Sequence, residues 1–280
     1  MATTTNHAGI SVVADYDFVG KFERNLDKLR ELFSASDWRR LVPGQTIRSH
    51  AIAGTFQAAQ TTPGAAVTPS SYADTGTLQP LTFNRWSVLT PVEDVMQYGR
   101  DEAILRNDDA LLKDIQKSTV AGIMTSISAG ATGSALGENF QQAAAAAWAE
   151  LGTACDNERC TPVFFANYKT ASDYLATANV TVQTAFGLTY LSNFMGIATL
   201  ILDVNVPDDK IWATAAENII IATADLRGVA EFDMYLEDDG VIAVAHREAM
   251  SNGAIATHAW VGIKAFPMFA NRFIVASITA

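Results

Sequence analysis

The sequence predicts an α+β fold, in which one long helix is accompanied by strands and short helices in mixed order. Two observations predict it. Residues 99–129 carry apolar side chains at helical spacing over an unusually long stretch. On either side, segments such as 45–56 and 259–279 are rich in β-forming residues. The 280 residues contain no internal repeat and suffice for one large domain or two modest ones.

The composition is apolar and poor in charge. Apolar residues make up 49% of the chain and charged residues only 18%, where about a quarter is usual. A chain with few charges must cover its surface with something else, and one way is to bury that surface against other subunits. The alternative is a soluble monomer rich in Ala and Thr.

The net charge of −11 disfavours nucleic-acid binding, which needs a basic face. Basic side chains concentrate in residues 21–40, where six basic and four acidic side chains leave a net charge of only +2. We interpret this segment as a solvated helix face with charge pairs.

The sequence predicts no metal site and no cofactor. Cys155 and Cys160 lack a second cysteine pair to complete a zinc site, and the four histidines show no ligand spacing. A disulfide between the two cysteines is one alternative, and free thiols, which a reducing cytoplasm favours, are the other. The first residues do not resemble a secretory signal and no apolar run could span a membrane, so we expect a cytosolic protein with no membrane partner.

Residues 15–34 are expected to form a helix, and Pro43-Gly44 ends this region. Five large apolar side chains follow one another at intervals of three or four residues, which places them on one stripe. The stripe suits a core helix packed in its own domain, and it equally suits an arm packed on a neighbouring subunit. Its members are Phe18, Phe22, Leu26, Leu29 and Phe33.

Residues 45–56 and 77–95 alternate as strands do and are expected to form a long hairpin. The stretch 55–77 between them carries one charged residue, Asp74. Connections of this length are usually functional or disordered. Because no His, Cys, Lys or Arg occurs there and Asp74 is the only acid, the tip is unsuited to acid–base catalysis.

Residues 99–129 are expected to form the longest helix, about 45 Å long at 1.5 Å per residue. Glu102 precedes Arg106, and Asp109 precedes Lys113, each by four residues with the acid first, which is the favoured order. Residues 130–137 then break the helix. The expected inward stripe is Ile104, Leu105, Leu112, Ile115, Thr119, Ile123 and Ile127.

The rest of the chain is read as shorter elements. We expect a helix over 138–151 that Gly152 stops, a buried strand over 162–168 and a helix over 169–176. We further expect strands over 197–203 and 210–215 flanking a turn at Pro207-Asp208, a hairpin over 232–248 around Asp239-Gly240, and β-rich sequence over 259–279.

No motif of a common enzyme class occurs in the sequence. The adjacent acids Asp108-Asp109 and residues 237–239 are interpreted as solvated side chains. We therefore predict no catalytic residue and expect that the protein is not an enzyme.

The order of elements resembles that of tailed-phage major capsid proteins, which have the Hong Kong 97-type fold. "VPGQTIRSHAIAGTF" looks like the start of that family's extended loop, and "LTFNRWSVLTPVEDV" followed by "MQYGRDEAILRNDDALLKDIQKSTVAGIMTSI" looks like the return strand and spine helix. "NFMGIATLILDVNVPDDKIWATAAENIIIA" looks like axial-domain strands, whereas "FDMYLEDDGVIAVAHREAM" and "ANRFIVASIT" look like peripheral-domain strands. The resemblance covers nearly the whole chain from about residue 40.

The resemblance implies a division of the chain. Residues 1–44 would be an N-terminal arm and 45–95 the extended loop hairpin. Residues 96–175 would form a peripheral domain with the spine helix, completed by 229–280, and 176–228 would form the axial domain.

The resemblance also implies a function. The protein would assemble with itself, as hexamers and pentamers, into the icosahedral head shell around phage DNA, and each extended loop would lie over a neighbour's spine. It would be made and assembled in the bacterial cytoplasm and reside in the virion capsid. A separate scaffolding protein and a portal would be partners, and DNA would be held without sequence-specific binding. The expected loop contacts are Phe56, Thr62, Pro63, Val67, Tyr72 and Asp74.

Some members of that family cross-link the loop through a lysine. No lysine occurs between Lys28 and Lys113, so we expect a non-covalent shell. The alternatives are an encapsulin-like nanocompartment with the same fold, a soluble α+β enzyme with a lid at 55–77, and a tail or head-decoration protein.

Overall fold

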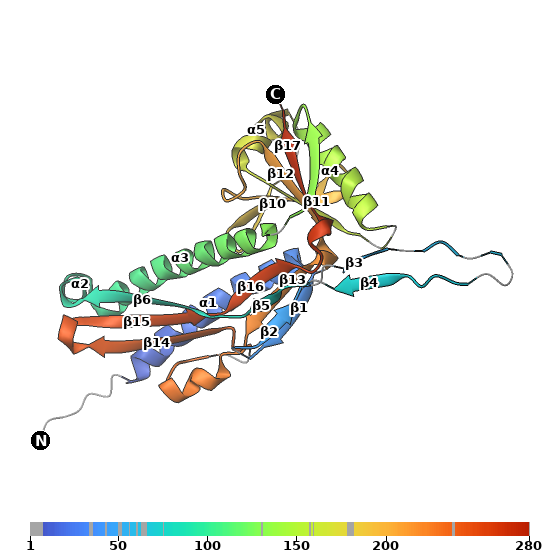
Figure 1. Ribbon diagram of the computed structural model, residues 1–280. Coiled ribbons are helices and arrows are strands. Elements are labelled where there is room, and N and C mark those ends of the chain that lie inside the picture. The colour runs from blue at the N-terminus through green and yellow to red at the C-terminus, as the bar shows by residue number, and fades with distance from the viewer. Residues whose placement is uncertain are drawn as a thin grey trace, which may run out of the picture.

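The computed structural model describes residues 8–33, 36–42, 44–49, 52–55, 57–59, 61, 62, 66–74, 76–129, 131–156, 158, 160–177, 182–236 and 239–279. They form two lobes from whose junction a long hairpin projects (Figure 1). An elongated lobe contains the long helix, and the other lobe contains the C-terminus.

The elongated lobe is built on two three-stranded sheets, ordered β14-β15-β6 and β1-β13-β16. Strand β1 runs parallel to β13, whereas the other neighbours in both sheets are antiparallel. Helices α1 and α3 run along this lobe (Figure 1). Its elements are α1 (Ala8–Leu32), β1 (Asp37–Leu41), β6 (Asn84–Pro91), α2 (Val92–Tyr98), α3 (Arg100–Ser128), β13 (Ile219–Ala224), β14 (Ile242–Ala249), β15 (Ala254–Val261) and β16 (Ile263–Pro267).

Helix α1 packs in the core of its own chain, which decides between the two readings of its apolar stripe. All five stripe residues are buried. The Phe22 ring meets Phe186 edge-on at 5.7 Å, and the Phe33 ring stacks on Phe165 at 6.5 Å. The helix begins at Ala8, earlier than the stripe indicates.

The second lobe contains a seven-stranded sheet ordered β7-β17-β12-β8-β11-β10-β9. Val163 and Phe165 of β8 face the core that includes α1 and α3, while Phe164 and Ala166 face the core under α4. Burial on both faces explains the continuous apolar run of this strand. The elements are β7 (Gly133–Gly137), α4 (Phe140–Ala154), β8 (Pro162–Ala166), α5 (Tyr168–Thr177), β9 (Gln183–Ala185), β10 (Leu188–Phe194), β11 (Ala198–Leu202), β12 (Lys210–Ala215) and β17 (Phe273–Ile278).

The predicted strands around Pro207-Asp208 exist as β11 and β12, but they do not pair with each other. Strand β8 lies between them, parallel to β11 and antiparallel to β12. The hydrophobic pattern shows that each strand is buried, but it does not show which strand is its neighbour.

Two predicted boundaries are wrong. Gly152 does not end α4, which continues to Ala154, because Leu151 and Cys155 are both buried and their packing outweighs the helix cost of about 1 kcal/mol for glycine. Residues 133–137, read only as a helix breaker, form strand β7 parallel to β17.

The hairpin predicted over 232–248 is wrong in its first half. Tyr235 makes one isolated bridge to Val244, and the strand partner of β14 is β15. Among the described residues, short 3-10 helices connect other elements: η1 (Ala216–Asn218), η2 (Arg227–Phe232), η3 (Met250–Asn252) and η4 (Ala270–Arg272).

The strands of one sheet come from both of the residue ranges that the resemblance assigned to the peripheral and axial domains. Strands β8 and β17, on the peripheral side of those limits, share one sheet with β11 and β12. Strand β13, on the axial side, pairs with β1 and β16. The C-terminal strand returns to the second lobe, so contiguous residue ranges do not describe its sheet.

Candidate assembly surface

The hairpin between the lobes is the most distinctive surface feature. Its stem is formed by β2 (Thr46–Arg48) with β5 (Leu78–Pro80), and its outer part by β3 (Ile52–Thr55) with β4 (Ser71–Asp74), both antiparallel. It points away from the body on the side opposite to α2 and does not fold over either lobe (Figure 1). The alternative of a soluble enzyme expects residues 55–77 to form a lid over a pocket of the same chain, and the hairpin does not have that position (Figure 1).

The stem is anchored by two apolar side chains. Ile47 and Leu81 are buried in a small core with Ile220 and Phe266. Beyond them the described hairpin residues are mostly exposed. The hairpin is therefore fastened at its foot only.

The predicted contact residues lie on this exposed part. Val67 is 77% exposed and Tyr72 is 61% exposed. Thr62 and Asp74 are exposed as well. Phe56 and Pro63 lie outside the described residues.

Asp74, the single charged residue of the stretch 55–77, binds within the hairpin. Its Oδ2 lies 3.6 Å from Nε of Arg48, and Arg48 Nη2 donates to the Asp74 carbonyl at 3.2 Å. Its Oδ1 accepts from the Gly76 backbone N–H at 2.9 Å. The charge is thus used for the shape of the stem.

Gly76 allows the two arms to approach closely. A Cβ at this position would lie 1.8 Å from the Ser49 carbonyl oxygen, where no atom fits. Beside it, the Ser49 N–H donates to the Thr77 carbonyl at 2.9 Å. Glycine is therefore required here for steric reasons.

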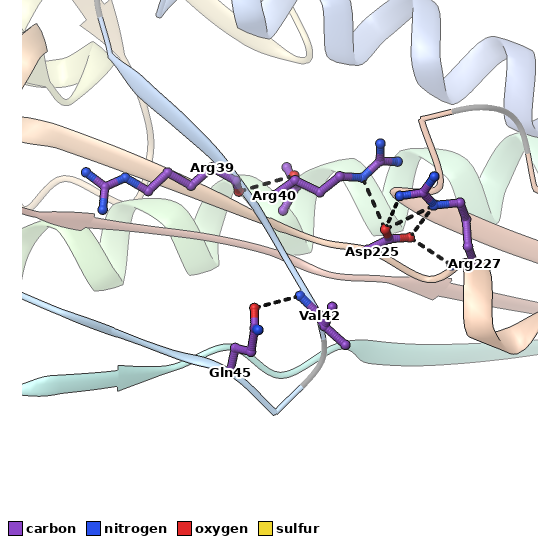
Figure 2. A network of polar contacts seen from close by, with 7 residues as sticks. Arg39, Arg40, Val42, Gln45, Asp225 and Arg227 are labelled. Atoms are coloured by element: carbon purple, nitrogen blue, oxygen red, sulfur yellow. Dashed lines mark hydrogen bonds and ion pairs between the residues drawn. The ribbon is translucent and has the colours of Figure 1, made fainter.

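An arginine cluster lies where β1 leads into the hairpin (Figure 2). Arg227 Nε donates to both oxygens of Asp225 at 2.9 and 3.0 Å, and Arg40 Nε lies 3.7 Å from Asp225 Oδ2. The Arg227 hydrogen bonds lower the pKa of Asp225 to about 2. On the same turn, Gln45 Oε1 accepts from the Val42 N–H at 3.1 Å, which fixes the entry into the stem.

Helix α3 carries both predicted acids, Glu102 and Asp109, but forms only one of the two predicted pairs. Arg106 Nε lies 3.4 Å from Glu102 Oε1, whereas Asp109 binds Lys21 Nζ of α1 at 2.8 Å, not its expected partner Lys113. The proximity of α1, which the local pattern does not reveal, explains the difference. Of the expected inward stripe, Leu105 is 39% exposed.

A buried polar cluster was not foreseen. His246 of β14 lies between Asp15 of α1 and Asp108 of α3, with Nδ1 2.5 Å from Asp15 Oδ1 and Nε2 2.8 Å from Asp108 Oδ2. Asp108, expected to be solvated, is 4% exposed, and Thr257 donates to its Oδ1 at 3.0 Å. The one local indication that Asp108 is buried was its position four residues before Leu112, which places it on the inward face of α3.

Burial alone lowers the pKa of His246, but hydrogen bonds from the ring to Asp108 and Asp15 outweigh it and raise the pKa to about 9. The imidazole is therefore charged at neutral pH. One positive ring between two carboxylates leaves the cluster with a net charge of −1.

Both cysteines are free thiols, as the reducing-compartment argument favoured. Cys155 is buried. Burial, together with a hydrogen bond to Cys155, raises the pKa of Cys160 to about 12.

Within the described ranges, no group of three or more His, Cys, Asp or Glu side chains is placed to hold a metal ion. No helix in this part of the chain combines the length and the hydropathy that a membrane crossing requires.

Comparison with known proteins identifies the fold. No protein-family model and no curated protein matches the sequence. Among solved structures, the capsid of a native GTA particle aligns with a TM-score of 0.55 at 12% identity, covering 89% of this chain and 90% of that one. The holo-SrpI encapsulin complex from Synechococcus elongatus PCC 7942 aligns with a TM-score of 0.54 at 13% identity, covering 89% and 86%. The mature capsid of bacteriophage PhiM1 aligns with a TM-score of 0.52 at 8% identity, covering 88% and 86%.

The chain therefore has the Hong Kong 97-like capsid fold, and the predicted α+β class and fold are confirmed. In the nomenclature of this fold, α3 corresponds to the spine helix and the projecting hairpin corresponds to the extended loop.

Proposed function

We propose that this chain is a structural shell protein that assembles with itself, and that its shell is the icosahedral head of a tailed phage. The observation that carries the proposal is the hairpin, which is anchored by Ile47 and Leu81 and exposes apolar side chains beyond its stem. A second copy of the chain would cover them. The similarity to solved capsid and encapsulin structures supports the same reading.

The contact would be formed by the extended loop on a neighbour's spine helix. Val67 and Tyr72 would supply apolar area, and the single charge of the stretch, Asp74, already lies beside Arg48. An uncharged contact surface avoids the cost of burying unpaired charges in an interface. Phe56, Thr62 and Pro63 complete the proposed contact set.

A nanocompartment that encloses protein cargo is the second candidate, favoured by the alignment with the encapsulin complex over 89% of this chain. The two candidates differ in content. A phage head would protect DNA from nuclease and would require a portal and a separate scaffolding protein, whereas a nanocompartment would contain a protein.

Electron microscopy and size-exclusion chromatography of the purified full-length protein, alone and with the products of neighbouring genes, test the proposal. Closed shells are expected. A discrete monomer or small oligomer under all of these conditions would refute it. Nuclease-protected DNA within the shells would favour the phage head, and a co-purifying enzyme inside them would favour the nanocompartment.

Val67 offers a matched pair of variants. Val67→Asp places a charge in the proposed contact and is expected to leave folded but unassembled subunits. Val67→Thr keeps the side-chain shape without a charge and should still give shells. If Val67→Asp assembles as well as Val67→Thr, the loop is not the contact.

A further inference from the structure

The cluster of Asp15, His246 and Asp108 joins three elements that are far apart in the sequence. Asp15 belongs to the N-terminal helix α1, Asp108 to the spine helix α3 and His246 to strand β14. The side chain of His246 is 2% exposed, and those of Asp15 and Asp108 are 11% and 6% exposed. Water therefore has little access to these charges.

The neighbouring groups that hydrogen-bond to Asp108 or lie beside it are uncharged. From β15, Thr257 lies opposite His246 in the strand register and donates to Asp108. From β6, Thr90 is buried and accepts from Asn107 at 2.8 Å, next to Asp108 in the chain. Among the described residues, Asp15 and Asp108 are thus the charged groups bonded to His246.

The geometry fixes the number of protons. Each ring nitrogen faces a carboxylate oxygen, but a neutral imidazole offers one N–H and one lone pair. Both contacts are hydrogen bonds only when the three groups share two protons, one in each contact. When one of these protons is lost, a ring nitrogen and a carboxylate oxygen, both acceptors, lie at hydrogen-bond distance with no hydrogen between them, and their lone pairs repel.

The cluster adjoins the apolar face that α1 presents from Phe18 onward. Asp15 lies three residues before Phe18 and seven before Phe22, so it continues their stripe. From Phe18 onward, α1 is held by buried apolar packing. The cluster therefore acts on the part of α1 that precedes Phe18.

We propose that Asp15, His246 and Asp108 form a proton-dependent clamp that fastens the first part of α1 to the spine helix and the sheet. Removing one of its two protons loosens residues 8–17 while the helix stays packed from Phe18 onward. The clamp lies within one chain and acts whether or not the chain assembles.

Amide hydrogen exchange of the full-length chain tests the clamp, with exposure times scaled to the intrinsic exchange rate at each pH. The protection of residues 8–17 is expected to fall about tenfold per pH unit between the ordinary His pKa of 6.5 and about 9, and then to level off. Residues 18–32 serve as the internal reference. Constant protection of residues 8–17 across this range would overturn the proposal.

The neighbouring acids provide matched variants. Asp15→Asn together with Asp108→Asn places an amide at each ring nitrogen, and an amide can donate or accept. This double variant should lose the pH dependence. Asp109→Asn breaks only the exposed pair with Lys21 between the same two helices and should leave it unchanged. The opposite result in either variant would contradict the clamp.

If the double variant does not fold, titration of the His246 ring by NMR in the wild-type chain decides the question. A ring that stays protonated up to about pH 9 supports the clamp. A ring that titrates near its ordinary value would overturn it.

Discussion

Arg48 and Asp74 face each other across the hairpin and are joined twice. Their charged atoms lie 3.6 Å apart, and Arg48 also donates to the Asp74 carbonyl at 3.2 Å. Arg48 ends strand β2 and Asp74 ends β4, so the pair lies where the stem meets the outer part. An acid that could have served an interface is thus used to set the direction of the loop.

Replacing Gly76 by alanine should misdirect the hairpin without unfolding the protein. The new Cβ would collide with the Ser49 carbonyl oxygen, at 1.8 Å, so the arms must separate. The foot held by Ile47 and Leu81 should remain. We expect an unchanged circular dichroism spectrum and at least a tenfold loss of assembled particles by size-exclusion chromatography. Gly44→Ala is the matched variant. Its new Cβ meets no atom within 4 Å, and because Gly44 has a positive φ, this variant tests backbone strain without the collision.

Mature shells should be non-covalent. The extended loop carries no lysine, because none occurs between Lys28 and Lys113. On a reducing SDS gel, boiled particles should give one band at the 30.0 kDa of the single chain. A ladder of linked multimers would contradict this prediction.

His246→Gln should destabilise the unassembled subunit at pH 7. It removes the positive ring from between two buried carboxylates, a loss on the order of 3 kcal/mol in the free energy of unfolding. The raised pKa of His246 contributes to the free energy of unfolding. This contribution is fully present below pH 6.5 and is lost as the pH rises to about 9. The difference between wild type and variant in urea unfolding should therefore shrink between pH 7 and pH 10. An equal difference at both pH values would mean that the ring acts by packing alone.

The cysteine thiols should react slowly in the folded chain. Because burial and the hydrogen bond to Cys155 raise the pKa of Cys160 to about 12, its thiolate fraction at pH 8 is about 10⁻⁴. Iodoacetamide should modify the native protein far more slowly than the urea-unfolded protein, as mass spectrometry can measure. Rapid native modification of Cys160 would show that the thiol is more exposed than the structure indicates.

Asp225→Asn should weaken the base of the hairpin at neutral pH. The carboxylate accepts from Arg227 and lies near Arg40, and its pKa of about 2 means that its stabilising effect is present above about pH 4 and is lost as the pH falls toward 2. The variant should have a lower melting temperature than wild type at pH 7. Near pH 2 the two proteins should converge, and a difference that persists there would contradict the charge argument.

The sequence by itself determined the elements whose signal is local. The stripe of α3, the alternation of residues 45–56 and the charge-poor stretch 55–77 are properties of neighbouring residues. Helix α3 lies within one residue of its expected limits, and β2 and β3 both lie within 45–56. The second expected arm, 77–95, is wrong as a single hairpin strand, because β5 pairs with β2, β6 pairs with β15 and residues 92–98 form α2, while the partner of β3 is β4, inside the stretch expected to be the tip. The order of the elements was enough to indicate the fold. By contrast, the insertion of β8 between β11 and β12 could not be read from either strand, because all three are buried and apolar.

Only the tertiary structure decided how the charged residues are used. Asp108 and Asp109 are adjacent and chemically identical, yet Asp108 is buried against His246 and Asp109 pairs with Lys21 at the surface. One step along a helix with 3.6 residues per turn rotates the side chain by about 100°, so the two acids meet different neighbours. Those neighbours come from α1 and β14, which lie far from them in the sequence. Local periodicity shows which way a side chain points, and long-range packing determines what it meets there.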